Sequence, residues 1–199
     1  MSLKKLLRRG QNLLVNPVDE FRIIAIEDPN VVTINRSYLL PVAILIALFA
    51  LIGSVYSNIS EPINTFLYVL INTIIVLLVV FSHVYLSGKL IALLGENITR
   101  DHHQKSYYAL SSYAQLPFLI VLALIKLFPS LIFLVFIGFY STYLFHKGTG
   151  LLSKIPSQKR LQFTLLSTLI MITSFIVCSE LYTLLYVEII EQFTTFAAL

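Results

Sequence analysis

The chain has 199 residues, of which 57% are hydrophobic and 12% are charged, with a formal net charge of +4. A soluble domain is about 45–50% apolar and about 25% charged, so this composition excludes an ordinary soluble protein. The basic residues lie between apolar runs and form no basic soluble segment, which argues against a nucleic-acid partner.

Residues 1–36 predict a cytoplasmic amphipathic segment made of two short helices. Leucines recur at helical spacing on one face of the first helix, and four basic residues occupy the other: Lys4, Lys5, Arg8 and Arg9. This pattern predicts either a helix in the headgroup plane that binds anionic lipid headgroups or a partner, or a helix packed on the membrane domain. Asn16 and Pro17 predict the start of the second helix, which Asp28-Pro29 ends.

Five apolar runs then predict an all-α, polytopic membrane protein with five transmembrane helices. About 20 helical residues, at about 1.5 Å each, cross the roughly 30 Å hydrocarbon core. The crossings of the 37–187 domain are expected at 37–56, 63–86, 107–128, 130–145 and 161–187, followed by a short tail at 188–199. We place Pro41 in the first turn of the first crossing, and the break between the third and fourth at Phe128-Pro129-Ser130.

Basic residues mark every second connection between these crossings. Six precede the first crossing, three separate the second from the third, and four follow the fourth. The other connections and the tail have none, apart from Lys126 just inside the end of the third crossing. By the positive-inside rule, the sequence predicts a multi-pass protein of the cell (inner) membrane, with a cytoplasmic N-terminus and an extracytoplasmic C-terminus.

No catalytic motif is present: the chain has no HExxH, no G-x-S-x-G, no phosphate-binding loop and no dinucleotide fingerprint. We therefore expect a non-enzyme without cofactor or metal. Three ionisable residues fall inside apolar runs, where a charge is costly unless paired or hydrated: His83, Lys126 and Glu180. We expect Lys126 and Glu180 at similar depth, either facing each other or extending separately to the outer interface.

Two functions fit these features. The first is a membrane scaffold that binds partners or lipids through the basic N-terminal helices and cytoplasmic loops. The second is a small transporter or channel, with a polar path between helices lined by Asn64, Asn72, Thr73, Gln115, Lys126 and Glu180. A transporter should place these side chains along one water-accessible path, whereas in a scaffold they should be dispersed or hydrogen-bonded between helices.

The start of the third crossing is unusually polar, running from Tyr107 through Tyr108, Ser111, Ser112 and Tyr113 to Pro117. We expect these tyrosines in the aromatic belt at the cytoplasmic interface, and we expect Pro117 to kink the helix. Gly148, after the fourth crossing, predicts a close approach between helices.

These two stretches together resemble the Yip family of Ypt/Rab-interacting membrane proteins, in its bacterial branch. The segment from Asn16 to Ile24 also resembles the amphipathic lead-in of that branch. The residues that match the family pattern are Pro17, Phe21, Tyr108, Tyr113, Pro117 and Gly148. The resemblance implies a five-helix membrane domain, a role in membrane organisation or trafficking, and homo- or hetero-oligomers. Eukaryotic members bind small GTPases, but this N-terminal region is short and has no Asp-Leu-Tyr-Gly-Pro type element.

Overall fold

The computed structural model describes residues 3–57, 62–99, 103–153 and 155–197, and the regular elements in these ranges are all helices. Five helical stretches there are long and apolar enough to cross a membrane: Val31–Tyr56, Tyr68–Thr99, Gln104–Leu127, Pro129–Leu152 and Ser157–Ile189. The predicted all-α, five-helix membrane protein is therefore confirmed.

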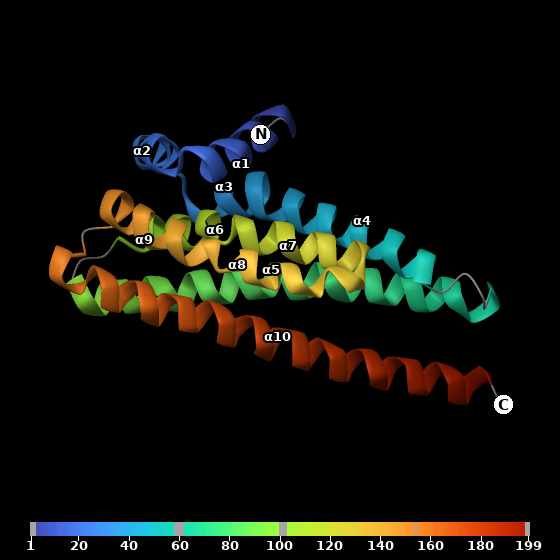
Figure 1. Cartoon of the computed structure of the whole chain (residues 1–199). Helices are drawn as coiled ribbons and strands as arrows, with labels where there is room; N and C mark the ends of the chain where they lie inside the picture. The colour runs from blue at the N-terminus through green and yellow to red at the C-terminus, as the bar shows by residue number, and fades with distance from the viewer. Residues whose placement is uncertain (1–2, 58–61, 100–102, 154, 198–199) are drawn as a thin grey trace.

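Two helices, α1 (Leu3–Val15) and α2 (Pro17–Glu27), form what we call the N-terminal cap. They lie across one end of the bundle, and α2 packs on α9 (Tyr140–Leu152) (Figure 1). Asp28 ends α2 in the left-handed region, at φ 38°, and its N–H donates to the Ile24 carbonyl at 3.1 Å. Aspartate tolerates left-handed backbone better than most residues. The helix therefore ends where Asp28-Pro29 predicted, and this expectation is confirmed.

The first crossing begins at Val31, six residues earlier than expected. Asn30 caps it, because its side-chain oxygen accepts from the Thr33 N–H at 2.7 Å. The crossing continues as α3 (Val31–Ile34), a π-helical turn, η1 (Asn35–Leu39), and α4 (Leu40–Ser57). Pro41 is thus well inside the helix and not in its first turn. The wide turn directly before it accommodates a residue that has no backbone N–H.

The second crossing, α5 (Pro62–Thr99), runs 13 residues past its expected end at 86. Residues 95–99, beyond that expected end, belong to this helix, and Tyr107 packs on this last part of α5. The Tyr107 hydroxyl lies 3.0 Å from Thr99 Oγ1. The third crossing divides at Gln115 into α6 (Gln104–Ala114) and α7 (Leu116–Leu127), which places the break expected from Pro117.

The break between the third and fourth crossings lies at Phe128 and Pro129, as expected. The fourth crossing begins at Pro129, one residue before its expected start, and ends at Leu152, seven residues past its expected end. It is broken into a 3-10 turn, η2 (Pro129–Leu134), a single turn, α8 (Val135–Gly138), and α9. After a second 3-10 turn, η3 (Ser157–Lys159), the long α10 (Arg160–Ala197) completes the chain. The helix continues through residues 188–197, so the expected tail prolongs the fifth helix. Figure 1 shows α10 diverging from the bundle toward its C-terminal end.

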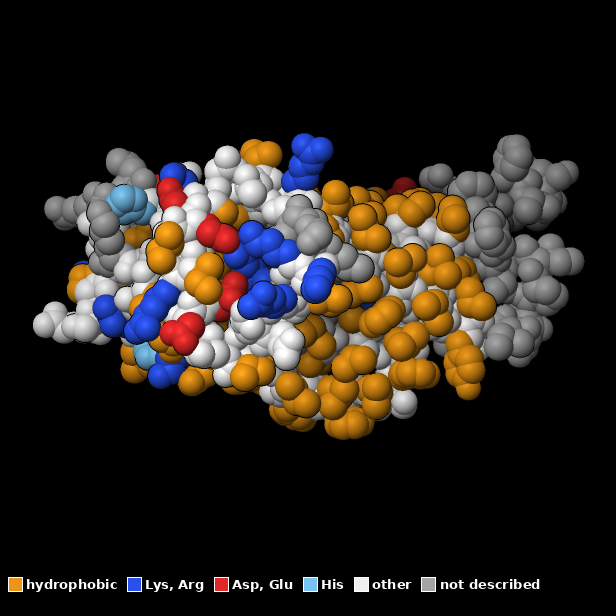
Figure 2. All heavy atoms as spheres, turned by 90° about the horizontal axis from the view of Figure 1, so that it is seen from above, with side chains coloured by type: hydrophobic (Ala, Val, Ile, Leu, Met, Phe, Trp, Pro, Cys, Tyr) orange, Lys and Arg blue, Asp and Glu red, His pale blue; other side chains and the backbone are white. Residues whose placement is uncertain are grey.

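The third crossing is the most buried of the five and forms the centre of the bundle. α5 and α9 pack against α6, and α4 packs against α7. Seen from above, charged side chains gather over the cap end of the molecule, and the described side chains on the rest of this face are mostly hydrophobic (Figure 2). This division matches a bundle in lipid with one end at the water interface.

Candidate functional site

The tyrosines of α6 lie inside the protein and not in an interfacial belt, which corrects our expectation. Tyr107, Tyr108 and Tyr113 are each at most 2% exposed. Tyr108 donates a hydrogen bond to Asn35 Oδ1, and the Tyr38 and Tyr113 rings lie 4.5 Å apart. The π-helical turn of the first crossing therefore contributes Asn35 and Tyr38 to a buried aromatic cluster at the end of the bundle that the cap covers.

Two glycines of α5 make room for these rings. A Cβ on Gly88 would come within 2.7 Å of the Tyr108 ring, and one on Gly95 within 2.6 Å of the Tyr107 ring. Such distances are far below van der Waals contact, so both rings lie directly on the α5 backbone. Small residues allow this close approach between membrane helices.

Arg9 joins the N-terminal cap to this cluster. Its Nε donates to Glu20 Oε1 at 2.9 Å, and another guanidinium nitrogen donates to Glu27 Oε2 at 2.6 Å. The Arg9 guanidinium also lies 5.6 Å from the centre of the Tyr113 ring, within the range of a cation–π contact. Arg9 and Glu20 are almost fully buried. Arg9 is therefore not available to lipid headgroups, and the expected headgroup-binding set is reduced to Lys4, Lys5 and Arg8.

The Arg9–Glu27 ion pair, which joins α1 to α2 within the cap, makes the packing of the cap sensitive to acid. Partial burial favours the neutral form of Glu27, but hydrogen bonding and attraction from Arg9, with a contribution from Lys5, outweigh it and lower the pKa of Glu27. The same contacts raise the pKa of Arg9 despite its burial. A carboxylate with a lowered pKa stabilises the folded state fully above its ordinary pKa of 4.5, and this contribution is lost as pH falls through the lowered value.

We therefore expect the N-terminal cap to stay docked at pH 7 and to loosen as the pH falls below 4.5 and through the lowered pKa of Glu27, because protonated Glu27 no longer balances Arg9. Hydrogen exchange of the α1 and α2 amides between pH 3 and pH 7, corrected for the intrinsic pH dependence, measures this. Glu27→Gln should exchange faster at pH 7 and show a weaker dependence on pH. Equal protection of the wild-type cap at pH 3 and pH 7 would show that ionised Glu27 does not stabilise the cap.

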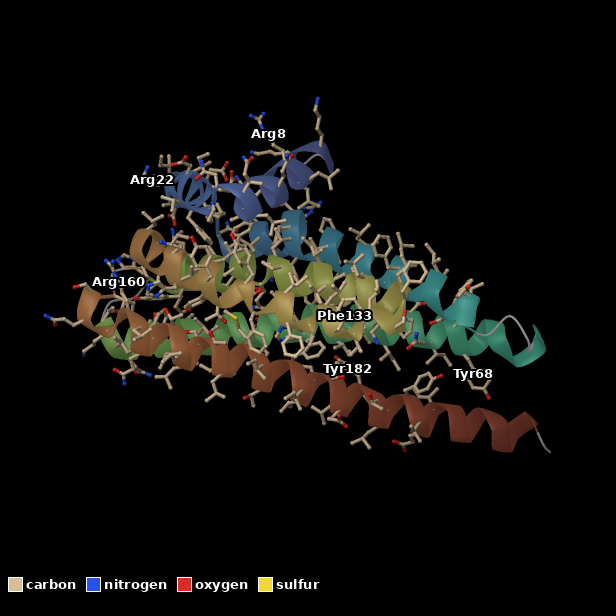
Figure 3. The ribbon with its side chains drawn as sticks, viewed as in Figure 1. Arg8, Arg22, Tyr68, Phe133, Arg160 and Tyr182 are labelled. Atoms are coloured by element: carbon tan, nitrogen blue, oxygen red, sulfur yellow. The ribbon has the colours of Figure 1, made fainter. Side chains whose placement is uncertain are left out.

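The outward face of α1 carries the remaining basic residues. Lys4, Leu7 and Arg8 lie on this face and are exposed, and the Arg8 side chain points away from the bundle (Figure 3). Lys5 is exposed at the edge of the face and lies 3.6 Å from Glu27. One side of α1 thus packs on the membrane domain, and the other presents basic and apolar side chains, so contact of the outer side with lipid headgroups stays a prediction.

Gly148 of α9 makes the close approach that we expected. A Cβ at this position would collide with the Leu110 side chain and lie 3.0 Å from the Phe21 ring. Phe21 is fully buried, and Pro17 at the start of α2 is also buried. Four residues of the family pattern thus share one role, since Pro17, Phe21, Tyr113 and Gly148 all lie where the cap meets the bundle.

Of the two alternatives for Lys126 and Glu180, the ion pair is not formed: the structure describes both side chains, and both are exposed. Lys126 borders a cavity of about 220 Å³ together with Ser179 and Thr183 of α10. Ser179 and Thr183 are four residues apart and share a helix face, whereas Glu180 lies about 100° around the helix and is exposed. The two charges therefore face different surroundings.

The other intramembrane polar residues are dispersed and mostly hydrogen-bonded to neighbours. Asn72 donates to Ser54, and Thr73 donates to the Val69 carbonyl of its own helix. Gln115 donates to the hydroxyls of Ser87 and Ser111. His83 is buried, with its Nδ1 3.0 Å from the Ser174 hydroxyl. The Asn64 side chain lies outside the described residues.

Sequence reasoning missed the two carboxylates that hold Arg9. Glu20 and Glu27 are seven residues apart, so they lie two turns apart on one face of α2. That spacing was a usable signal, because an acidic stripe on α2 complements the basic residues of α1. Asn35 and Tyr38 gave no such signal, since their inward placement depends on the π-helical turn.

Comparison with known proteins assigns most of the chain to one family. Residues 12–178 match the model of the Yip1 domain, so the match includes the end of α1, all of α2 and most of the helical bundle. No curated protein and no solved structure matches the chain.

Proposed function

The chain belongs to the Yip1 domain family, and on that premise we propose that it is a non-enzymatic membrane scaffold that binds anionic lipid headgroups and partner proteins through its N-terminal cap. The observation that carries this proposal is the two-sided cap. Arg9, through Tyr113, and Phe21, against Gly148, hold its inner side on the bundle, and its outer side is left basic and apolar.

The outer side of the cap has the composition of an interfacial surface. Leu7 is 61% exposed, Val15 79% and Ile26 85%, and the basic residues Lys4, Lys5 and Arg8 lie on the same cap. Apolar side chains of this kind enter the boundary between headgroups and acyl chains, while lysine and arginine attract anionic lipid at about 1 kcal/mol each. We propose that this surface contacts the membrane or a partner already bound to it.

The proposed orientation follows from the basic connections. The N-terminal cap would face the cytoplasm of a cell whose inner membrane holds the bundle, and the C-terminus would lie on the other side. This placement brings the cap surface to the leaflet that carries anionic lipid. We also propose the bacterial branch of the family and a role in membrane organisation or trafficking, with homo- or hetero-oligomers as the working assembly and no nucleic-acid partner.

The alternative of a transporter or channel receives less support from the same residues. A conduit needs polar side chains along one continuous path. Asn72 and Gln115 bond to neighbouring helices, Thr73 bonds to its own helix and Glu180 is exposed, so the described candidates for the path are separated. Satisfied polar groups between helices are typical of packing.

The test uses the full chain in nanodiscs, with Cys178→Ala and an environment-sensitive dye on Leu7→Cys. With phosphatidylglycerol in the bilayer, we expect the dye to be protected from an aqueous quencher, and we expect this protection to weaken at high salt. Replacing Lys4, Lys5 and Arg8 by glutamine should make the dye severalfold more accessible. The matched control is Arg22→Gln, which removes an exposed charge of α2 and should leave the dye protected.

Two outcomes would count against the scaffold. Equal protection in phosphatidylcholine and phosphatidylglycerol bilayers would show that the basic residues contribute nothing to lipid contact. Protein-dependent release of an entrapped ion or small solute from proteoliposomes, abolished by Lys126→Met, would favour the transporter.

A further inference from the structure

The cavity beside Lys126 lies between α5, α7 and α10, in the half of the bundle opposite the cap. We call it the Lys126 cavity, and its volume is about 220 Å³. It lies where α10 leaves the bundle. The hydroxyls of Tyr182 and Ser82 are 3.0 Å apart and hold α10 against α5 beside the cavity (Figure 3). From there α10 diverges toward its C-terminal end (Figure 1).

The lining of the Lys126 cavity is apolar toward the middle of the bundle and polar away from the cap. On α7, Leu122 lies about one turn nearer the cap than Lys126. The other two helices show the same change. In the direction away from the cap, Val80 and Val79 are followed by Asn72 on α5, and Phe175 is followed by Ser179, Thr183 and Tyr186 on α10. This gradient fits an amphiphile whose polar head lies near the interface and whose hydrocarbon chain points into the membrane.

The polar end of the cavity holds a positive charge that the described part of the chain does not balance. The Lys126 side chain forms no hydrogen bond and no ion pair with any described residue. None of the described lining residues is acidic, and the exposed Glu180 and Glu188 of α10 lie outside the lining. A charge at the edge of the hydrocarbon is costly unless it is paired or hydrated, so an unpaired ammonium here favours an anionic ligand.

Two hydroxyl groups at the same end can assist Lys126. The Ser179 and Tyr186 hydroxyls have no hydrogen-bond partner among the described residues, so both can donate to an anion. Thr183 is already used, because its hydroxyl donates to the Ser179 carbonyl at 2.8 Å. Lys126 is also exposed, so a lipid beside α7 and α10 can reach its ammonium without separating the helices.

The volume of the cavity accommodates more than an inorganic ion. A water molecule takes up about 30 Å³, and a dry cavity of roughly 150 Å³ already holds benzene. The Lys126 cavity is larger than that, and its part near Leu122 and Phe175 is apolar. Water or a small anion at the polar end would leave this apolar part unfilled, whereas a hydrocarbon chain attached to the anion fills it.

We propose that the Lys126 cavity binds an anionic amphiphile, with its carboxylate or phosphate on Lys126, Ser179 and Tyr186 and the start of its hydrocarbon chain between Leu122 and Phe175. A free fatty acid and an acidic phospholipid both carry this chemistry, and the ligand reaches the cavity from the membrane. The site does not depend on the scaffold function proposed for the cap, because it lies in the opposite half of the bundle.

The test is photolabelling of the full chain in phosphatidylcholine nanodiscs with palmitic acid that carries a diazirine close to its carboxyl group. At pH 8 this group is ionised. The matched probe is its methyl ester, which has the same chain and diazirine but no charge. We expect the acid to label α10 around Phe175 and Ser179, as read by mass spectrometry of the peptides. The ester should label about tenfold less, as the loss of one charge-assisted hydrogen bond predicts.

Competition identifies the source of the ligand. Unlabelled palmitate should compete with the probe, because it has the same head group. If phosphatidylglycerol in the nanodisc also removes the label from α10 and leaves background labelling of the other helices unchanged, the ligand is an acidic phospholipid. If the label persists in phosphatidylglycerol and only palmitate removes it, the ligand is a fatty acid.

Variants separate the charge from the cavity itself. Lys126→Met should reduce labelling by the acid to the level of the ester, and Lys126→Arg should retain it. Lys126→Glu should reverse the preference, so that a diazirine-bearing hexadecylamine labels in place of the acid. Thr183→Trp, which fills the cavity from an exposed position, should abolish labelling. Leu184→Trp, at the next position of α10, is 66% exposed and outside the lining, and should leave labelling unchanged.

Three results would overturn the proposal. Equal labelling by acid and ester would show that the positive charge selects nothing. Unchanged labelling of Lys126→Met by the acid would place the binding site elsewhere. No competable labelling at all would show that Lys126 extends to the interface by itself and that the cavity selects no anion.

Discussion

Replacing Arg9 by methionine should loosen the N-terminal cap, because Arg9 joins α1 to Glu20 and Glu27 of α2 and contacts Tyr113 of the bundle. The substitution leaves Glu20 buried without its cation, and breaking a buried ion pair from one side costs about 3–5 kcal/mol. Since 1.4 kcal/mol is a factor of ten, we expect the α1 and α2 amides to exchange hydrogen roughly a hundredfold faster or more. Hydrogen exchange with mass spectrometry on the detergent-solubilised chain measures this.

The chain offers a matched control on the same helix. Arg8 is exposed and next to Arg9 in sequence, so Arg8→Met removes the same charge without affecting the buried pair and should leave exchange of the cap unchanged. Adding Glu20→Leu to Arg9→Met should restore part of the protection, because an apolar pair can replace a buried ion pair at little cost. A cap that stays fully protected in Arg9→Met would show that Phe21 and the other apolar contacts suffice.

Gly53→Ala should destabilise the bundle at the opposite end from the cap. A Cβ at this position would overlap the Lys126 carbonyl oxygen and lie 3.0 Å from that of Leu127, so α4 and α7 must separate. Backbone atoms cannot move aside as a flexible side chain can, and overpacking costs about 1–3 kcal/mol or more. We expect the unfolding midpoint to fall by about 5–10 °C. A thiol-reactive dye can measure this midpoint, because Cys178 is only 5% exposed in the folded chain and reacts once the chain unfolds.

The control is the same substitution in a different environment. A Cβ on Gly10 would meet Leu116 at 3.5 Å, an ordinary van der Waals distance, and alanine is the better helix former by about 1 kcal/mol. Gly10→Ala should therefore keep or raise the midpoint. If Gly53→Ala had the same unfolding midpoint as Gly10→Ala, the close approach of α4 to α7 would not contribute to stability.

Local and compositional features were predictable from the sequence. The five crossings follow from apolar runs of bilayer length, since each run needs lipid regardless of its neighbours. Breaks at Phe128 and near Pro117 follow from proline, which lacks an N–H to donate. The close approach at Gly148 was also foreseen, because a glycine beside polar aromatic residues favours tight packing.

The orientation of side chains within the helices could not be predicted. In a membrane bundle, lipid-facing and buried positions are both apolar, so hydropathy does not show which face turns inward. The tyrosines of α6 therefore suited the interface as well as the core, and only packing against Gly88, Gly95 and the π-helical turn η1 places them inside. Lys126 and Glu180 likewise have matching depths but different azimuths around their helices.

The number of membrane crossings, the helix breaks and the family pattern were thus determined by the sequence alone, because each depends on residues close together in the chain. The roles of Arg9, His83 and Gln115 were decided by the tertiary structure. Each depends on partners from other helices: Glu20 and Tyr113 for Arg9, Ser174 for His83, and Ser87 for Gln115. Charge or polarity alone cannot tell a buried anchor from a surface contact, because burial is set by what packs around the side chain.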